Sequence, residues 1–506
     1  MFMKNHTKVW GIFIATGIVI SVNARYQNLI DKTSESTQLK KTVSEQITAT
    51  PQSTAAQKPA STTASIREDV QLTPSAAASE QEGQTAEKEN FALWHYDKKT
   101  RCLTIIGNGE MIDESPENSN GDSAPRSYMI TNTSPKDLDM YYVSQKAREV
   151  IIEPGVTAIN TSAFCDFVKL EKVTIPDSVK KIKDYAFYGC ESLKEITIPD
   201  HVKRIGRECF CHCTSLKKIT LGKNVAAIGE GAFGNLPELR NITLKPGNQY
   251  LITKNGTLYH KKKKILYLNY AKSSVITIDK GTKKIADFAF QWNNNVRQIT
   301  IPASVTVIGG GAMYHCSNLR RVLFAKHSKL KKIKKFSRYY DTSGLYGCFQ
   351  YCNRLEEISL PEYLETTETP SDAFLDCPAL KKIYFGKKYK GEILIYSNPL
   401  MEITVSKNNQ TYCSKDGILY DKKMETLLVY PCKKNADKFH VPKSVKKISY
   451  SAFQKCKKLQ SVVIYGKKTK IDRNAFRGSK HITIYAPKNS NAQKYAKKHK
   501  MKFVGI

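Results

Sequence analysis

The sequence predicts a repeat solenoid in which short parallel β-strands of successive coils stack on one another. Phe recurs at positions 164, 187, 210 and 233, a spacing of 23 residues, and each time it follows Ala or Cys. A strand-like triplet keeps the same spacing, as in Val173-Thr174-Ile175 and Ile196-Thr197-Ile198. A unit of this length cannot bury its apolar side alone, so it is stabilised by stacking on its neighbours.

The repeat extends over residues 150–485, which we expect to form the solenoid. After an interruption the pattern resumes at six further positions, which are Phe290, Met313, Phe349, Phe374, Phe453 and Phe476. Met313 replaces the usual Phe, and residues 334–347 are expected to form a longer loop because they lengthen the period there.

Each unit is expected to contain two short strands and a corner. The run from Leu193 to Ile198 alternates apolar and polar residues, as a half-buried strand does. Pro199 then ends this strand because it lacks a backbone donor. The apolar pair Val179 and Ile182 predicts the second strand, and the Ala-Phe-x-x-Cys segment predicts a short helical turn at the corner.

Two insertions within the solenoid predict β-hairpins, near residues 248–270 and 409–431. Each places Asn-Gly or Asp-Gly between apolar runs, which is the strongest short-range hairpin signal. The segment 91–149 is expected to close the N-terminal end with two strands and a loop over 113–136, and the segment 486–506 to close the C-terminal end with a short helix and a last strand.

The N-terminal residues predict export. Basic residues precede an apolar run from Val9 to Val22, and small or aliphatic residues end at Ala24, so residues 1–24 are predicted to be a signal peptide. The alternative is an uncleaved N-terminal helix; no other segment is apolar enough to cross a membrane. Residues 25–90 are rich in Ser, Thr, Gln and Ala and are predicted to be a disordered stalk.

The composition combines a strong basic excess with many cysteines. The net charge is +34, from 80 Lys and Arg against 46 Asp and Glu, which favours anionic partners and says nothing about the fold. Six of the 13 cysteines share one register, three residues after the Phe or Met of the repeat. We interpret them as free thiols in a buried column, although disulfides between adjacent coils would span a suitable distance.

The units IPDSVKKIKDYAFYGCESLKEIT and VPKSVKKISYSAFQKCKKLQSVVIY resemble the BspA-like leucine-rich repeats of bacterial surface proteins. The resemblance covers roughly residues 150–485. It implies a right-handed solenoid of parallel strands that is exported to the cell surface and takes part in adhesion. It also implies no catalytic residues, and we predict no enzyme activity.

Metal and cofactor chemistry are not predicted. The run from Cys209 to Cys213 contains three cysteines and a histidine, which are zinc ligands, but Cys213 lies in the column register and Cys209 takes the small inward position. Cysteines spaced two residues apart, as on a strand, do not by themselves complete a tetrahedral site. No metal site and no cofactor are therefore expected.

Two sets of surface positions are candidates for binding. Lysine pairs at fixed registers predict basic stripes on adjacent coils, at Lys180, Lys181, Lys217, Lys218, Lys381, Lys382, Lys446 and Lys447. Threonines between the apolar strand residues predict an extended binding face, at Thr174, Thr197, Thr220, Thr243 and Thr300. The alternative interpretations are a solvated charged face and simple β-propensity.

These features predict a secreted or cell-surface protein that binds an extracellular protein or glycan. The alternative is a structural protein of the envelope, held to anionic cell-wall polymers by its basic surface and without a specific ligand. Nucleic acid is not an expected partner, because export is predicted and no nucleic-acid-binding signature is present. The sequence does not identify the ligand.

Overall fold

The computed structural model describes residues 92–111, 140–334, 336–338, 341–367, 373–391 and 399–506. The chain divides into two compact units, Met1–Thr85 and Ala86–Ile506, and all the described residues belong to the second. The predicted signal peptide (1–24), stalk (25–90) and cap loop (113–136) lie outside the described residues. Within the described part, no helix combines the length and the apolar character needed to cross a membrane.

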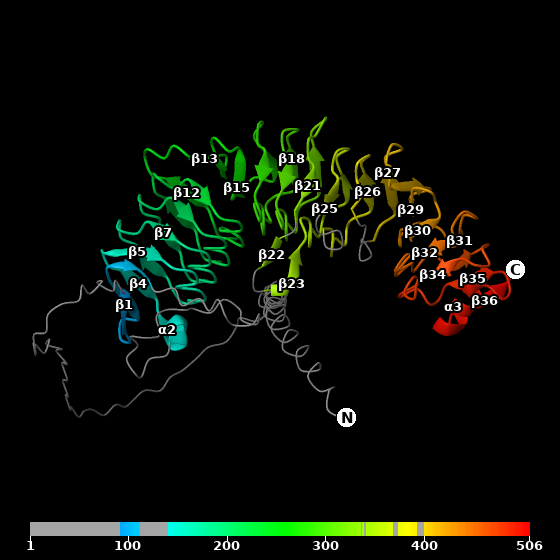
Figure 1. Cartoon of the computed structure of the whole chain (residues 1–506), viewed down its shortest axis with the longest axis horizontal. Helices are drawn as coiled ribbons and strands as arrows, with labels where there is room; N and C mark the ends of the chain where they lie inside the picture. The colour runs from blue at the N-terminus through cyan, green and yellow to red at the C-terminus, as the bar shows by residue number, and fades with distance from the viewer. Residues whose placement is uncertain (1–91, 112–139, 335, 339–340, 368–372, 392–398) are drawn as a thin grey trace, which may run out of the picture. The chain divides into compact units, whose positions relative to one another are not determined.

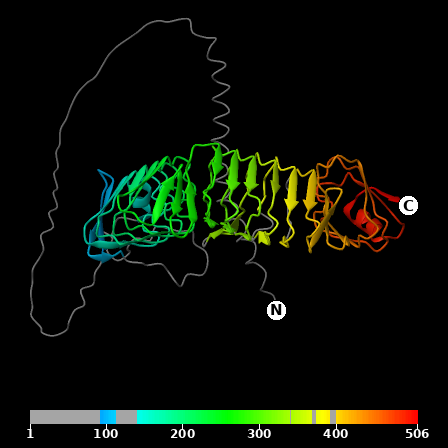
Figure 2. The ribbon, with the colours of Figure 1, turned by 90° about the horizontal axis from the view of Figure 1, so that it is seen from above.

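The second unit is a parallel β-solenoid whose coils follow one another in sequence order (Figures 1 and 2). The first strands of successive coils pair in parallel within several short sheets. These first strands are β6 (Lys172–Thr174), β8 (Glu195–Thr197), β10 (Lys218–Leu221), β12 (Asn241–Leu244), β16 (Val275–Thr277), β18 (Gln298–Ile301), β20 (Arg321–Phe324), β24 (Glu357–Ser359), β26 (Lys382–Phe385), β27 (Glu402–Val405), β31 (Lys438–His440), β33 (Ser461–Val463) and β35 (Thr483–Ala486). The predicted repeat solenoid is thereby confirmed.

The second strands pair in parallel with one another in three other sheets. They are β3 (Gly109–Glu110), β5 (Val156–Ile159), β7 (Lys181–Ile182), β9 (Arg204–Ile205), β11 (Ala227–Ile228), β17 (Lys284–Ile285), β19 (Val307–Ile308), β21 (Lys332–Ile333), β25 (Thr366–Thr367), β32 (Lys447–Ile448) and β34 (Lys470–Ile471). Each is short because the chain turns sharply on both sides.

The two predicted hairpins are present, and each continues into a third strand. The first comprises β13 (Leu251–Lys254), β14 (Thr257–His260) and β15 (Ile265–Asn269), and the second comprises β28 (Tyr412–Lys415), β29 (Ile418–Asp421) and β30 (Thr426–Val429). The third strands β15 and β30 then pair in parallel with β17 and β32. Each insertion therefore supplies the second strand of its own coil and is part of the solenoid.

Described parts of the segment 334–347, which was expected to be a longer loop, form β-strands. It contains the antiparallel pair β22 (Phe336–Arg338) and β23 (Asp341–Tyr346). The ring of Phe336 is buried and lies 4.4 Å from the ring of Phe288, and the Arg207 guanidinium lies 5.1 Å from the centre of the Phe336 ring. The hairpin thus packs against earlier coils, on both sides of the first insertion.

Both ends of the solenoid are covered. At the N-terminal end, β1 (Ala92–Asp97) and β2 (Cys102–Gly107) form an antiparallel pair, and β4 (Glu149–Ile152) joins β2 to the first strands after helix α2 (Met140–Lys146). At the C-terminal end, Ser490 caps helix α3 (Asn491–His499), which buries Ala492, Tyr495 and Ala496 before the last strand β36 (Phe503–Gly505).

The corner of each coil places its Phe in a stacked column. Ring centres of Phe164 and Phe187 lie 5.2 Å apart, those of Phe187 and Phe210 lie 5.4 Å apart, and the rings are nearly parallel. The corner itself consists of tight hydrogen-bonded turns, as where Cys190 N–H donates to the Phe187 carbonyl. The apolar pattern of the sequence therefore becomes a buried column of stacked rings within these coils.

None of the 13 cysteines forms a disulfide, and this includes the six that share one register and were interpreted as thiols. The Cys213 thiol donates to the Phe187 carbonyl at 3.2 Å, and the Cys316 thiol donates to the Phe290 carbonyl at 2.9 Å. Ser479 takes the same position and donates to the Phe453 carbonyl at 2.8 Å. Burial raises the pKa of Cys316, so the side chain stays a protonated donor that links adjacent coils.

Candidate functional site

Three of the predicted binding threonines lie side by side. Thr197, Thr220 and Thr243 are in register on β8, β10 and β12, with Thr197 and Thr243 exposed. Thr174 on β6 pairs with Ile151 of β4, and Thr300 belongs to a separate sheet. The predicted threonines therefore lie in three sheets, and the first insertion separates the sheet of β12 from that of β16.

Lys218 and Lys382, at one register of the first strands, lie beside opposite charges and not in the expected stripe of like charges. Lys218 lies in register between Glu195 and Asn241. Lys382 lies between Glu357 and Glu402, and its ammonium is 3.2 Å from the Glu402 carboxylate. A row of unrelieved positive charge is therefore not present at this register, where each of these two lysines has a glutamate on an adjacent coil.

One residue earlier, the backbone of Lys217 is hydrogen-bonded to Lys194 on one adjacent coil and to Arg240 on the other, so like charges follow one another there. Lys217, just before β10, is exposed.

The predicted pair near the C-terminal end is also partly neutralised. The Lys446 ammonium lies 2.7 Å from the Glu425 carboxylate, and that of Lys447 lies 3.3 Å from Asp472. Lys470 is the neighbour of Lys447 on the next coil. Most of the charge at these positions is exposed, and such surface pairs contribute little to stability.

A groove of about 630 Å³ crosses the starts of five first strands, β16, β18, β20, β24 and β26. We call it the strand-face groove. Its lining residues are Ser274, Val275, Arg297, Gln298, Arg320, Arg321, Glu356, Glu357, Lys381 and Lys382. Of the predicted residues, it contains only Lys381 and Lys382. The arginines and glutamates were not predicted, because lysine pairs in the sequence do not indicate the charge at each strand register.

A second groove, of about 690 Å³, lies along the second strands β7 and β9. We call it the basic groove. It is lined by Thr161, Lys180, Lys181, Ile182, Lys183, Asp184, His201, Lys203, Arg204 and Gly206. It brings Lys180 and Lys181 together with the basic pair of the next coil. Lys183 and His201 were missed because neither belongs to a repeated pair.

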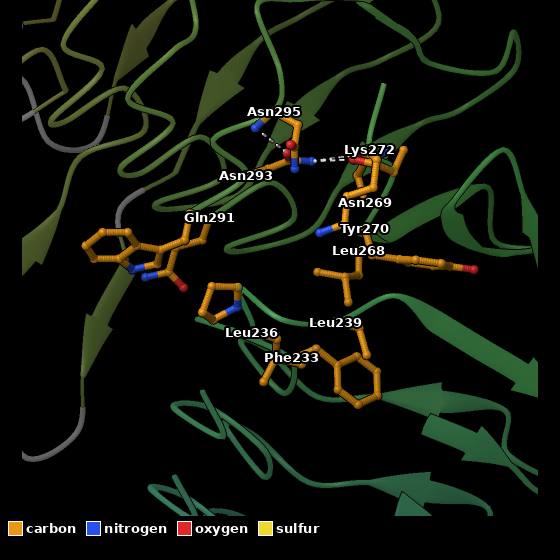
Figure 3. A pocket seen from close by; sticks show the side chains of 13 residues that line it. Phe233, Leu236, Leu239, Leu268, Asn269, Tyr270, Lys272, Gln291, Asn293 and Asn295 are labelled. Carbon is orange, nitrogen blue, oxygen red and sulfur yellow. Dashed lines mark hydrogen bonds between the residues drawn. The ribbon is translucent and has the colours of Figure 1, made fainter. Parts of the chain in front are cut away.

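A third and smaller cavity lies where the first insertion separates two coils (Figure 3). Phe233, Leu236 and Leu268 line its apolar side. Its amides bond to one another, since Asn293 Nδ2 donates to Asn269 Oδ1 at 2.8 Å. The volume is about 30 Å³, enough for a water molecule or two and not for a larger ligand.

The Cys209 to Cys213 segment has the environment of a core. Cys209, Cys211 and Cys213 are buried, and burial raises the pKa of Cys209 well above its ordinary value. Across the described ranges, no group of three or more His, Cys, Asp or Glu side chains is arranged to hold a metal ion.

The repeat itself decides the family. A family model described as BspA type leucine rich repeat region, in six copies, matches residues 138–257, 263–398, 345–415 and 428–498. The chain belongs to the BspA-type leucine-rich repeat family. This family is typically non-enzymatic and suggests a protein-binding role.

Solved bacterial leucine-rich repeat proteins are similar to this BspA-type chain. One from Eubacterium ventriosum is 20% identical, with 72% of this chain and 92% of that chain covered and a TM-score of 0.48. One from Bacteroides ovatus is 21% identical, with coverage of 82% and 98% and a TM-score of 0.40. A leucine rich cell surface protein from Faecalibacterium prausnitzii is 18% identical, with coverage of 78% and 98% and a TM-score of 0.35. No curated protein matches the chain.

Proposed function

We propose that this BspA-type protein is secreted or held at the cell surface, where it binds an extracellular protein or glycan without catalysis. The predicted N-terminal signal supports export, and the family supports binding. The ligand is proposed to dock on the strand-face groove.

The observation that carries this proposal is the mixture of groups in the strand-face groove. Arg297, Arg320 and Arg321 lie beside Glu356 and Glu357 across successive coils. Arginine is enriched in protein interfaces, and a pattern of both signs selects a partner with the complementary pattern. Solenoid repeats present such residues on an extended face, which suits a macromolecule better than a small ligand.

A second candidate function is attachment to the cell's own wall. The net charge of +34 favours association with anionic wall polymers, even without a specific ligand. Attachment of this kind depends on many weak and exposed charges, so salt would remove it. This property separates the second candidate from the first.

The test is the binding of the full chain to an array of extracellular matrix proteins, mucin glycans and isolated wall polymers, at low and high salt. The variant Arg320→Ala/Arg321→Ala is compared with Arg473→Ala/Arg477→Ala, which removes the same charge from exposed positions near the C-terminal end. We expect the first variant to weaken binding to one protein or glycan by about tenfold or more, and the second to leave it unchanged. Binding to wall polymers alone, lost at high salt, would instead support the second candidate.

A further inference from the structure

The basic groove gathers positive charge from two successive coils. Ile182 of β7 pairs with Ile205 of β9, so Lys181 and Arg204, which precede them, are neighbours. Adjacent strands lie about 4.8 Å apart, which leaves these two cations close together. Lys180 and Lys203 extend the charge beside them, and all four side chains are exposed.

The carboxylates near the groove do not neutralise it. Glu110 lies 2.5 Å from the Lys181 ammonium and 3.4 Å from that of Lys183, so one carboxylate serves two lysines. Asp184 accepts a hydrogen bond from the backbone N–H of Arg207 at 2.7 Å. Among the described residues, no carboxylate forms an ion pair with Lys180, Lys203 or Arg204.

The shape of the groove selects a polymer over a single ion. Its cations are spread along two coils, so a ligand that engages them all must carry several anionic groups in a row. The methylene stems of Lys180, Lys181 and Lys203 supply apolar walls beneath their charged ends. A sugar ring has an apolar face that can pack on such walls, while its sulfate groups reach the ammonium and guanidinium groups.

We propose that the basic groove is a binding site for a linear sulfated polysaccharide. The sulfates pair with Lys180, Lys203 and Arg204, which have no carboxylate partner among the described residues, and the sugar rings lie along the lysine stems. His201 borders the groove with its ring oriented by a hydrogen bond between Nδ1 and the Asp177 carbonyl at 2.8 Å. This site does not depend on the strand-face proposal, because the two grooves share no residue.

The experiment measures the affinity of the full chain for heparin by calorimetry at physiological salt. The variant Lys180→Gln/Lys203→Gln/Arg204→Gln removes the three unpaired charges. The control Lys326→Gln/Lys457→Gln/Lys494→Gln removes the same charge from exposed lysines elsewhere. Three exposed ion pairs are worth about tenfold in the dissociation constant, so we expect that loss in the first variant and less than twofold in the control.

Two further probes identify the chemistry. Desulfated heparin of the same length is expected to bind at least about tenfold more weakly than heparin, because it lacks the anions that the groove recognises. Equal loss in the control variant would overturn the proposal, since it would mean that net charge alone drives binding. Equal or tighter binding of a polyol-phosphate polymer, lost in the groove variant, would also overturn it and make the groove a wall-attachment site.

Discussion

The corner residues show how one backbone requirement is met by different side chains. The residue two after each Phe has a positive φ, and Gly189 and Asn235 adopt this conformation at little cost. Trp292, His315 and Tyr351 adopt it as well, which is uncommon for bulky residues. Their rings stack with centres 3.8 Å and 4.4 Å apart, so stacking across three coils offsets the backbone cost.

The stacked His315 makes stability depend on pH. Burial lowers the pKa of His315 from its ordinary value of 6.5 to about 4. Between these values the unfolded chain binds a proton that the folded chain does not, so the free energy of unfolding falls as the pH drops from about 6.5 to 4. The loss is roughly 2 kcal/mol once the partial exposure of the ring is considered.

The variant His315→Asn isolates this effect, because Asn235 already occupies the equivalent position of another coil. Urea unfolding of the wild type and of the variant at pH 7 and pH 4.5 gives, for each protein, the change in the free energy of unfolding between the two pH values. We expect the wild type to lose about 2 kcal/mol more than the variant between these pH values. Parallel pH profiles would mean that His315 is protonated in the folded protein and that the stack tolerates its charge.

The β-strands and their turns were largely predictable from local residues. The Asn255-Gly256 and Asp416-Gly417 pairs have the positive φ values that a tight hairpin turn requires, so the residue types alone indicated both hairpins. The third strands β15 and β30 were not predicted as parts of the solenoid. Their parallel pairing joins segments across a turn, and no local pattern specifies which partner they take.

The candidate sites were less predictable than the strands. The repeat register correctly placed Thr197, Thr220 and Thr243 in one row. The charge around each lysine was harder to predict, because the environment of Lys218 or Lys382 depends on the residues of neighbouring coils and not on the lysine pair itself. The residues at the same register of the preceding coil are Glu195 beside Lys218 and Glu357 beside Lys382, and these pairs can be read from the repeat.

The hairpin β22–β23 is expected to stabilise earlier coils through the packing of Phe336 on them. Its ring is 3% exposed and contacts Phe288 and Arg207 on earlier coils. The change Phe336→Ala would remove these contacts and leave a cavity, which we expect to lower the free energy of unfolding by about 3 kcal/mol. Urea unfolding measures the loss, and hydrogen exchange should show faster exchange around Arg207 and Phe288.

The variant Phe336→Leu serves as the control, because it keeps most of the apolar volume and loses the ring contacts. We expect it to cost about half as much as the alanine variant. If neither variant changes hydrogen exchange in the earlier coils, the hairpin stabilises only its own coil, and the interpretation that it stabilises earlier coils is wrong.

At the scale of the whole second unit, the two insertions divide the apolar core. Adjacent side chains of β14 and of β29 point to opposite sides, as strand geometry requires. Leu258 belongs to the first apolar cluster and Tyr259 to the second, while Leu419 belongs to the second and Tyr420 to the third. Each insertion therefore separates two clusters and packs one of its faces on each of them. The coils of one cluster need not unfold together with those of another.

We therefore predict that a destabilising substitution in one cluster increases local unfolding in that cluster and not in the others. Phe453 is fully buried in the third cluster and stacks on Phe476 with ring centres 4.7 Å apart. Phe453→Ala should cost about 3 to 5 kcal/mol locally and speed hydrogen exchange over residues 432–506, with residues 150–247 unchanged. Phe187→Ala in the first cluster is the matched variant and should show the reverse pattern. Faster exchange along the whole solenoid in either variant would mean that the insertions transmit unfolding, and that the three clusters form one cooperative unit.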